Sequence, residues 1–170
     1  MKKILPYVLF VIGFMLVAGA GFYAWHTSQP QNTGSAGANV PQAMAGYPLS
    51  QSLTGAEALA SIKQLHGVDF PLASGLVAEY GQKNATLWLA ETSSDAQAAE
   101  LVKSMEARIA QGGTTFTPMS VVQFSGHDVY MLDNQGEFNF YFQSGAKVIW
   151  LAIDTAKAEQ AMKELLAFYP

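Results

Sequence analysis

The chain contains no cysteine, and only 13% of its residues are Asp, Glu, Lys or Arg. Without cysteine there is no disulfide framework, no thiolate metal site and no lipid-modified amino-terminal cysteine. The three histidines, His26, His66 and His127, do not stand at metal-ligand spacing. A copper site built from His127, Met119 and Met131 is a weaker interpretation than core packing of the two methionines. The sequence therefore predicts no metal, no cofactor and a fold held together by packing.

Catalytic motifs are missing as well. The sequence has no Walker loop, no Rossmann glycine pattern and no haem-attachment motif. Ser125, His127 and Asp128 supply the residue types of a nucleophilic triad, but neighbours in a tight turn diverge, and no Gly-x-Ser-x-Gly elbow surrounds the serine. Residues 133–137 match a calcium loop in residue type but lack its twelve-residue spacing. We therefore do not expect an enzyme.

One long apolar run stands out against this background. Residues 4–25 carry no charge, and as a helix they reach about 33 Å, close to the roughly 30 Å hydrocarbon core of a bilayer. Lys2 and Lys3 precede the run, so the positive-inside rule places the amino terminus in the cytoplasm. Tyr23 and Trp25 stand where aromatic side chains settle at the opposite interface. The sequence predicts a transmembrane signal-anchor helix of a single-pass, bitopic cell-membrane protein.

A cleaved secretory signal is the alternative to a retained anchor. Residues 18–20 are Ala-Gly-Ala, the small-x-small form that signal peptidase accepts, and cleavage would follow Ala20. Apolar sequence nevertheless continues to Trp25, and the run is longer than the 7 to 15 residues usual for a signal. We favour the anchor, which leaves the rest of the chain extracytoplasmic, in the periplasm of a bacterial envelope.

Composition divides the chain into three parts. Residues 1–25 form the cytoplasmic stub and anchor, residues 26–46 an uncharged flexible linker, and residues 47–170 an extracytoplasmic domain. Seven of the nine basic residues and all thirteen acidic ones follow the anchor, which gives that part a net charge of −6. A domain of this charge has no electrostatic reason to bind nucleic acid.

An internal repeat indicates the fold. Residues 85–90 read Ala-Thr-Leu-Trp-Leu-Ala, and residues 147–152 read Lys-Val-Ile-Trp-Leu-Ala; each copy follows a strand-like run and a turn. A helix is expected over 54–66, and alternating strands over 119–124 and 128–132. The sequence predicts an α+β domain with a mainly antiparallel sheet of about six strands and helices packed on it.

Each copy of the repeat precedes an expected helix. The first helix begins at Ser94 and stops at Gly112. The second begins at Asp154 and runs to the end of the chain, with Phe168 on its inward side. The repeated order suggests a duplicated strand-strand-helix unit.

The tryptophans of the repeat, Trp88 and Trp150, are the candidate interaction residues. Alternation along a strand places each on the face opposite its aliphatic neighbours. Aliphatic rows usually receive helices, so we expect both indoles to face away from the helices. If nothing covers that face, they form an exposed platform for a partner or ligand; otherwise they are core residues.

These features favour a non-catalytic interaction or accessory module of an envelope complex, with a protein partner that the sequence does not identify. The first alternative is a small-ligand-binding or sensory domain with a pocket between sheet and helices, and the second is a hydrolase. A flat apolar patch favours a partner, whereas a concave pocket with convergent polar groups favours a ligand.

Overall fold

The computed structural model describes residues 40–66, 70–112 and 114–170. The predicted anchor, including Lys2, Lys3, Tyr23 and Trp25, and the linker up to residue 39 lie outside these residues. Within the described ranges, no helix is both long and apolar enough to cross a membrane.

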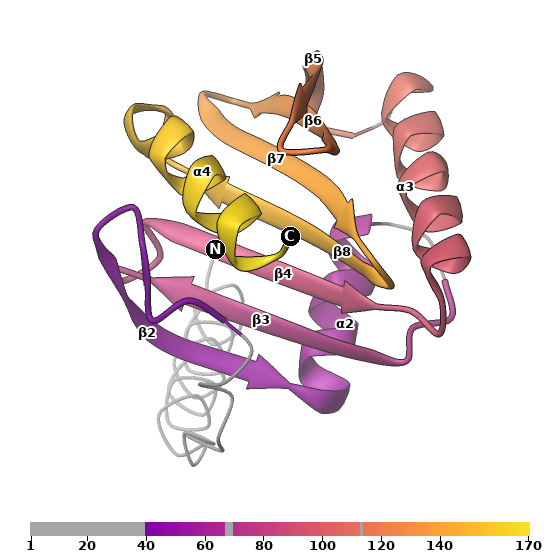
Figure 1. Cartoon of the computed structure of the whole chain (residues 1–170), viewed down its shortest axis with the longest axis horizontal. Coiled ribbons are helices and arrows are strands. Elements are labelled where there is room, and N and C mark those ends of the chain that lie inside the picture. The colour runs from indigo at the N-terminus through magenta and orange to yellow at the C-terminus, as the bar shows by residue number, and fades with distance from the viewer. Residues whose placement is uncertain (1–39, 67–69, 113) are drawn as a thin grey trace, which may run out of the picture. The chain divides into compact units, whose positions relative to one another are not determined.

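One antiparallel sheet of eight strands organises the described residues (Figure 1). Its spatial order is β1-β2-β3-β4-β8-β7-β6-β5, so β1 and β5 form the two edges. The strands are β1 (Ala43–Met44), β2 (Tyr47–Thr54), β3 (Ser74–Tyr80), β4 (Ala85–Glu91), β5 (Thr117–Phe124), β6 (His127–Asn134), β7 (Glu137–Ser144) and β8 (Lys147–Ile153). The helices are α2 (Gly55–His66), α3 (Asp95–Ala110) and α4 (Ala158–Phe168), and a short 3₁₀ turn (Thr155–Lys157) precedes α4. The α+β class and the antiparallel sheet are confirmed.

The sheet has eight strands in the described part of the chain, not the expected six or so. The two additional strands are β1 and β2, which precede the first helix. The β2 sequence, Tyr-Pro-Leu-Ser-Gln-Ser-Leu-Thr, is mostly polar and has only one β-branched residue, so propensity gives little sign of a strand there. Its pairing with β3 supplies the order that local propensity does not.

The folded region also begins earlier than expected. Val40, Met44 and Ala45, which belong to the predicted flexible linker, are buried at 2%, 0% and 0% exposure. The amide of Ala45 donates a hydrogen bond to Glu164 Oε2 on α4 at 2.6 Å. The phenol of Tyr80 on β3 donates to the carbonyl of Pro41 at 3.0 Å. Residues 40–46 are therefore part of the folded domain.

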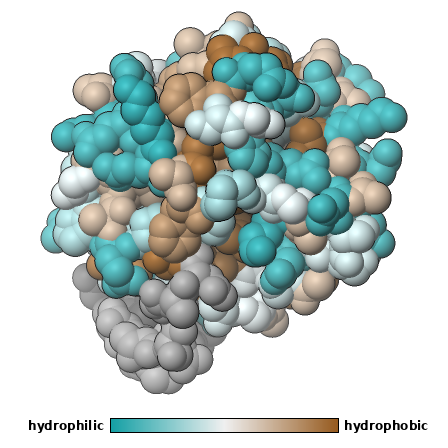
Figure 2. All heavy atoms as spheres, viewed as in Figure 1, coloured by the Kyte–Doolittle hydropathy of each residue, from teal (hydrophilic) through white to brown (hydrophobic). Residues whose placement is uncertain are grey.

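The helices cover both faces of the sheet. Ala58 and Ile62 of α2 share one core with Leu101 and Met105 of α3, and this core lies on the face that carries the tryptophans. Leu165 of α4 belongs to a second core on the opposite face, together with Val40, Met44, Ala45 and the aliphatic sides of β4 and β8. In Figure 1, α4 lies in front of the sheet and α2 behind it. Figure 2 shows the α4 face, where hydrophobic side chains gather at the top, over the β5, β6 and β7 end of the sheet.

Local sequence explains the helix boundaries. Ser94 caps α3 by accepting a hydrogen bond from the Gln97 amide at 3.3 Å, as the sequence predicts. The last helix begins at Ala158 rather than Asp154, because a 3₁₀ turn occupies the residues between them. Phe168 is 43% exposed, so its expected inward position is wrong.

Tight turns join most neighbouring strands. Ser125 and Gly126, between β5 and β6, have φ angles of 51° and 85°, the left-handed values that a two-residue type I′ hairpin turn requires. Gly81, after β3, has a φ of 55°, and a Cβ there would lie 2.8 Å from the ring of Tyr47. Glycine at position 81 is therefore required both by the backbone and by the close approach of β2.

The repeat is visible in the register at the centre of the sheet. Strand β4 pairs with β8 so that Trp88 lies directly opposite Trp150. The residues that precede Trp88 pair with those that follow Trp150, and the residues that follow Trp88 pair with those that precede Trp150. The helices that follow break this symmetry, because α3 packs on the tryptophan face and α4 on the other. The expected duplication thus describes the strand pairs but not the placement of the helices.

Candidate interaction surface

A row of aromatic side chains crosses the tryptophan face. Tyr130 on β6, Tyr141 on β7, Trp150 on β8 and Trp88 on β4 are successive partners in the strand register. The rings of Tyr130 and Tyr141 stack with centroids 4.7 Å apart, and those of Tyr141 and Trp150 with centroids 5.0 Å apart. Cross-strand aromatic pairs of this kind stabilise a sheet beyond their area burial.

Trp150 is a core residue in this row. It is 2% exposed, and Phe116, from the segment between α3 and β5, meets its ring edge-on at 4.9 Å. The indole Nε1 donates a hydrogen bond to Oδ1 of buried Asn139 at 2.9 Å. Of the two alternatives that the sequence left open for Trp150, an exposed platform or a core position, the structure shows the core position.

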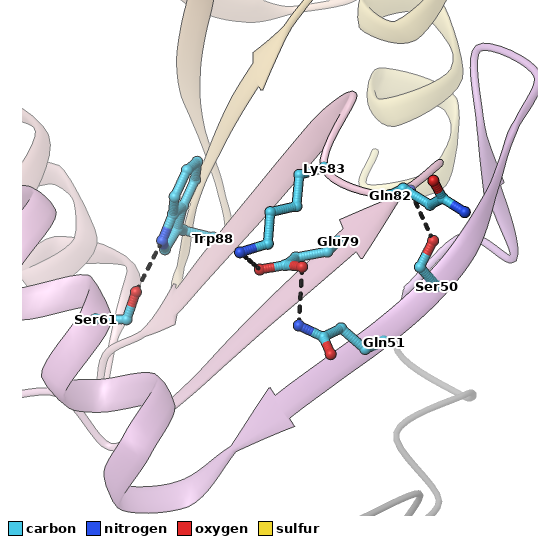
Figure 3. Close-up of polar contacts among 7 residues, drawn as sticks. All are labelled: Ser50, Gln51, Ser61, Glu79, Gln82, Lys83 and Trp88. Carbon is cyan, nitrogen blue, oxygen red and sulfur yellow. Dashed lines mark hydrogen bonds and ion pairs between the residues drawn. The ribbon is translucent and has the colours of Figure 1, made fainter. Parts of the chain in front are cut away.

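Trp88 is partly buried and lies beside α2, with its indole nitrogen directed toward Ser61 (Figure 3). Its Nε1 donates to Ser61 Oγ on that helix at 3.1 Å. On the neighbouring strand, the Glu79 carboxylate accepts a hydrogen bond from Gln51 Nε2 at 2.8 Å. The same carboxylate lies 3.8 Å from the Lys83 ammonium group. Both indoles thus face helices, contrary to expectation, because the aliphatic and the tryptophan faces are both covered.

The aromatic row becomes accessible where α3 ends. That helix packs mainly against β7 and β8 and contacts the β5–β6 hairpin less extensively. Tyr130 is consequently only partly buried, and the row ends on β5 at Val121, which is 54% exposed. Burial, together with the carboxylates of Glu106 and Asp128, raises the pKa of the Tyr130 phenol above its ordinary value.

An apolar groove of about 200 Å³ lies between α3 and the β5–β6 hairpin. Side chains from four elements line it: Ile109 of α3, Met119 and Val121 of β5, Tyr130 and Leu132 of β6, and Tyr141 of β7. Met119 is 58% exposed, the highest value among the exposed large hydrophobic residues of the described chain. The groove therefore presents apolar side chains to solvent.

A second, polar hollow of about 310 Å³ lies on the other side of Tyr130. Asp95 of α3, Asp128 of β6 and Gln143 of β7 contribute to its lining. His127 Nδ1 lies 2.7 Å from the Gln143 carbonyl oxygen, which can only accept, so Nδ1 donates this hydrogen bond. Within the described ranges, no three His, Asp or Glu side chains are grouped as metal ligands.

Strand β5 forms an edge of the sheet beside these two hollows. It pairs with β6 on one side only, and no described strand lies on its other side. The chain has no charged residue between Arg108 and Asp128, so the whole strand is uncharged. Natural edge strands usually carry charge, proline or a bulge to prevent further pairing. In β5 these devices occur only at the start, with Pro118 and a register shift between Pro118 and Ser120.

The sequence analysis did not identify the β5 edge and its apolar groove as an interaction surface. It assigned residues 119–124 to a strand but not to an edge, and the alternation of a strand does not reveal where in the sheet it lies. The absence of charge from residues 109–127 was the available signal. Comparisons with protein-family models, with curated proteins and with solved structures gave no match.

Three tyrosines are buried in the folded domain. Burial raises the pKa of Tyr80, Tyr141 and Tyr169 well above 10.0. We call these three the buried tyrosines. Their phenols stay protonated throughout the physiological range, so they act as packing and hydrogen-bonding groups.

Proposed function

We propose that this protein is a single-pass, membrane-anchored protein-interaction module whose folded domain acts outside the cytoplasm. The observation that supports the interaction role is the uncharged free edge of β5, which exposes Met119 and Val121 beside an apolar groove. Exposed apolar side chains that adjoin an unpaired edge are typical of sites where another chain binds.

The arrangement of the domain favours access to this edge. The chain enters the domain at β1, and β5 lies at the opposite edge of the sheet. Seven interstrand steps separate the two edges, about 34 Å at the usual spacing. Residues 26–39, which remain of the predicted linker, reach at most about 50 Å when extended. A partner thus approaches β5 from the side remote from the tether.

Site-specific photo-crosslinking in intact membranes tests the interaction. A photoreactive residue at Val121 is compared with one at Leu53, which is 37% exposed on β2 near the other edge of the sheet. We expect a defined protein adduct from position 121 and none from position 53, with the adducts identified by mass spectrometry. Equal labelling from the two positions, or none from position 121, contradicts the proposed surface.

Fractionation of the same membranes tests the anchor separately. The uncleaved protein, beginning at Met1, is expected to resist carbonate extraction, and protease added outside spheroplasts should digest the domain. A soluble product that begins at Gly21 would show that the segment is a cleaved signal.

A small-ligand sensor is the second candidate, favoured by the polar hollow at His127 and Gln143. That hollow is open and lined by polar and apolar groups together, whereas ligand sites usually enclose most of the ligand surface. Thermal shift against a library of small metabolites, compared between the wild type and Gln143→Ala, tests this candidate. A shift that the substitution removes would favour the sensor.

A further inference from the structure

We propose that the partner at the β5 edge is a second copy of this chain, paired antiparallel to the first about a two-fold axis at Val122. The inference deepens the proposed function, because it names the occupant of the same surface. In the resulting dimer, the two eight-stranded sheets form one continuous sheet.

The hairpin geometry determines which backbone groups face outward. Phe124 and His127 flank a two-residue turn, and such a flanking pair exchanges hydrogen bonds within its own hairpin. Because these directions alternate along a strand, the backbone N–H and C=O groups of Val122 also point toward β6. The N–H and C=O groups of Val121 and Gln123 therefore point outward, away from β6. The free edge therefore offers two donors and two acceptors in the regular part of the strand.

This regular part is symmetric about Val122. The register shift lies between Pro118 and Ser120, so uninterrupted pairing with β6 covers residues 120–124. A two-fold axis at Val122 places Val121 opposite Gln123 of the second copy, and Gln123 opposite Val121 of the second copy. The outward groups of these residues then satisfy one another, and Pro118, which has no amide proton to donate, lies outside the paired segment.

Charge makes the β5 edge the part of the surface where two copies can meet. The part of the chain beyond the predicted anchor carries a net charge of −6, so two copies repel each other through most of their surfaces. The β5 edge is the exception, since no charged residue lies between Arg108 and Asp128. Self-pairing there brings no like charges directly opposite each other, so an isologous interface at this edge avoids that destabilising contact.

The proposed anchor makes the same contact feasible at low affinity. An edge of this length buries less surface than a stable soluble dimer usually needs. Two copies held in one bilayer meet at a raised effective concentration, which compensates for a weak interface. Because the tether enters at the β1 edge, two domains can join through β5 without placing their tethers between them.

Disulfide crosslinking of single-cysteine variants tests the pairing, since the natural chain has no cysteine. The full chain is used in native membranes under mild oxidation. In the proposed register, position 122 meets itself as a non-hydrogen-bonded pair, with Cα atoms about 4.5 Å apart, within the range that a disulfide spans. We expect Val122→Cys to give a homodimer band and Leu53→Cys, at the opposite edge, to give none.

Two further variants fix the register. Val121→Cys and Gln123→Cys should each remain monomeric alone, because each is offset from its own copy, and should crosslink when the two variants are co-expressed. Crosslinking of Val121→Cys with itself would overturn this register, and crosslinking at position 53 as strong as at position 122 would show only random collision in the membrane.

A charge variant separates loss of pairing from loss of folding. Val121→Lys places a cation on an exposed side chain, so the domain should fold normally. In the double variant that combines Val121→Lys with Val122→Cys, the crosslink through position 122 should fall at least tenfold. Leu53→Lys is the matched control and should leave the crosslink unchanged. Carbonate-resistant protein that gives no dimer from position 122 overturns the second copy but leaves the anchored module intact. An adduct of another mass from position 122 identifies a different partner and likewise overturns the inference.

Discussion

The burial of Met44 leads to a prediction that distinguishes a folded segment from a flexible linker. Met44 belongs to the two-residue strand β1, and its side chain is 0% exposed within the core beneath α4. Met44→Ala removes three heavy atoms from that core. At about 0.8 kcal/mol for each methylene-sized group, the transfer term alone is about 2.4 kcal/mol. A residual cavity adds to this loss, so we expect a decrease of about 2 to 5 kcal/mol in the free energy of unfolding.

Urea unfolding followed by far-UV circular dichroism measures this decrease. Met119→Ala is the matched control, because Met119 is 58% exposed on β5. Its free energy of unfolding should lie within about 0.5 kcal/mol of the wild-type value. A decrease of 2 kcal/mol is a large fraction of the roughly 5 to 15 kcal/mol that stabilises a domain, so the two variants are readily separated. Equal midpoints and equal slopes for Met44→Ala and the wild type would refute the assignment of residues 40–46 to the core.

Three other predictions concern the core and its turns. Trp150→Ala should lower the free energy of unfolding by about 3 to 5 kcal/mol and Trp88→Ala by less, because Trp88 is only partly buried; equal losses in thermal melts would contradict the difference in burial. The domain should lose stability above pH 10, because the phenols of the unfolded chain then ionise while burial keeps those of the buried tyrosines protonated in the native state, and this difference stabilises the unfolded state. Urea midpoints between pH 8 and pH 11 measure this loss, and Tyr141→Phe should reduce its slope. Gly81→Ala should destabilise the domain by more than about 1 kcal/mol in the same urea assay, since a left-handed backbone and contact with β2 both disfavour a side chain there; an unchanged midpoint would show that the turn can relax.

Periodicity in the sequence predicted most of the fold. The buried side chains of α3, from Ala98 to Ile109, lie at the expected helical spacing, and the strand pairs of the repeat lie where the Trp-Leu-Ala copies indicated. These features depend on local alternation, which a single sequence displays directly.

The position of the surface could not be predicted in the same way. Alternation along the strand correctly placed Trp150 opposite its aliphatic neighbours, but it carried no information on whether a helix covers that face. The covering helix is α3, whose inward residues Leu101 and Met105 fit either face of a sheet equally well. The decision between the two faces depends on chain connections that are set by the complete topology.

The same limit applies to the amino-terminal residues. Met44 and Ala45 stand in a segment of Gly, Ala, Gln and Pro that is typical of a linker. They are ordered by contacts with α4, more than a hundred residues later in the chain, such as the Ala45 to Glu164 hydrogen bond. Local composition cannot register an interaction at that sequence distance.

The pairing of β4 with β8 has a consequence for biosynthesis. Strand β8 is the last strand to be made, yet it occupies the middle of the sheet and joins β4 to β7. Until residues 147–153 are synthesised, β1 to β4 form one group of strands and β5 to β7 another, each with an unfilled side. Such an order delays cooperative folding until synthesis is almost complete and leaves the edge of β4 open to pairing with other nascent chains. A chain that stops before residue 147 therefore lacks the strand that unites its two halves.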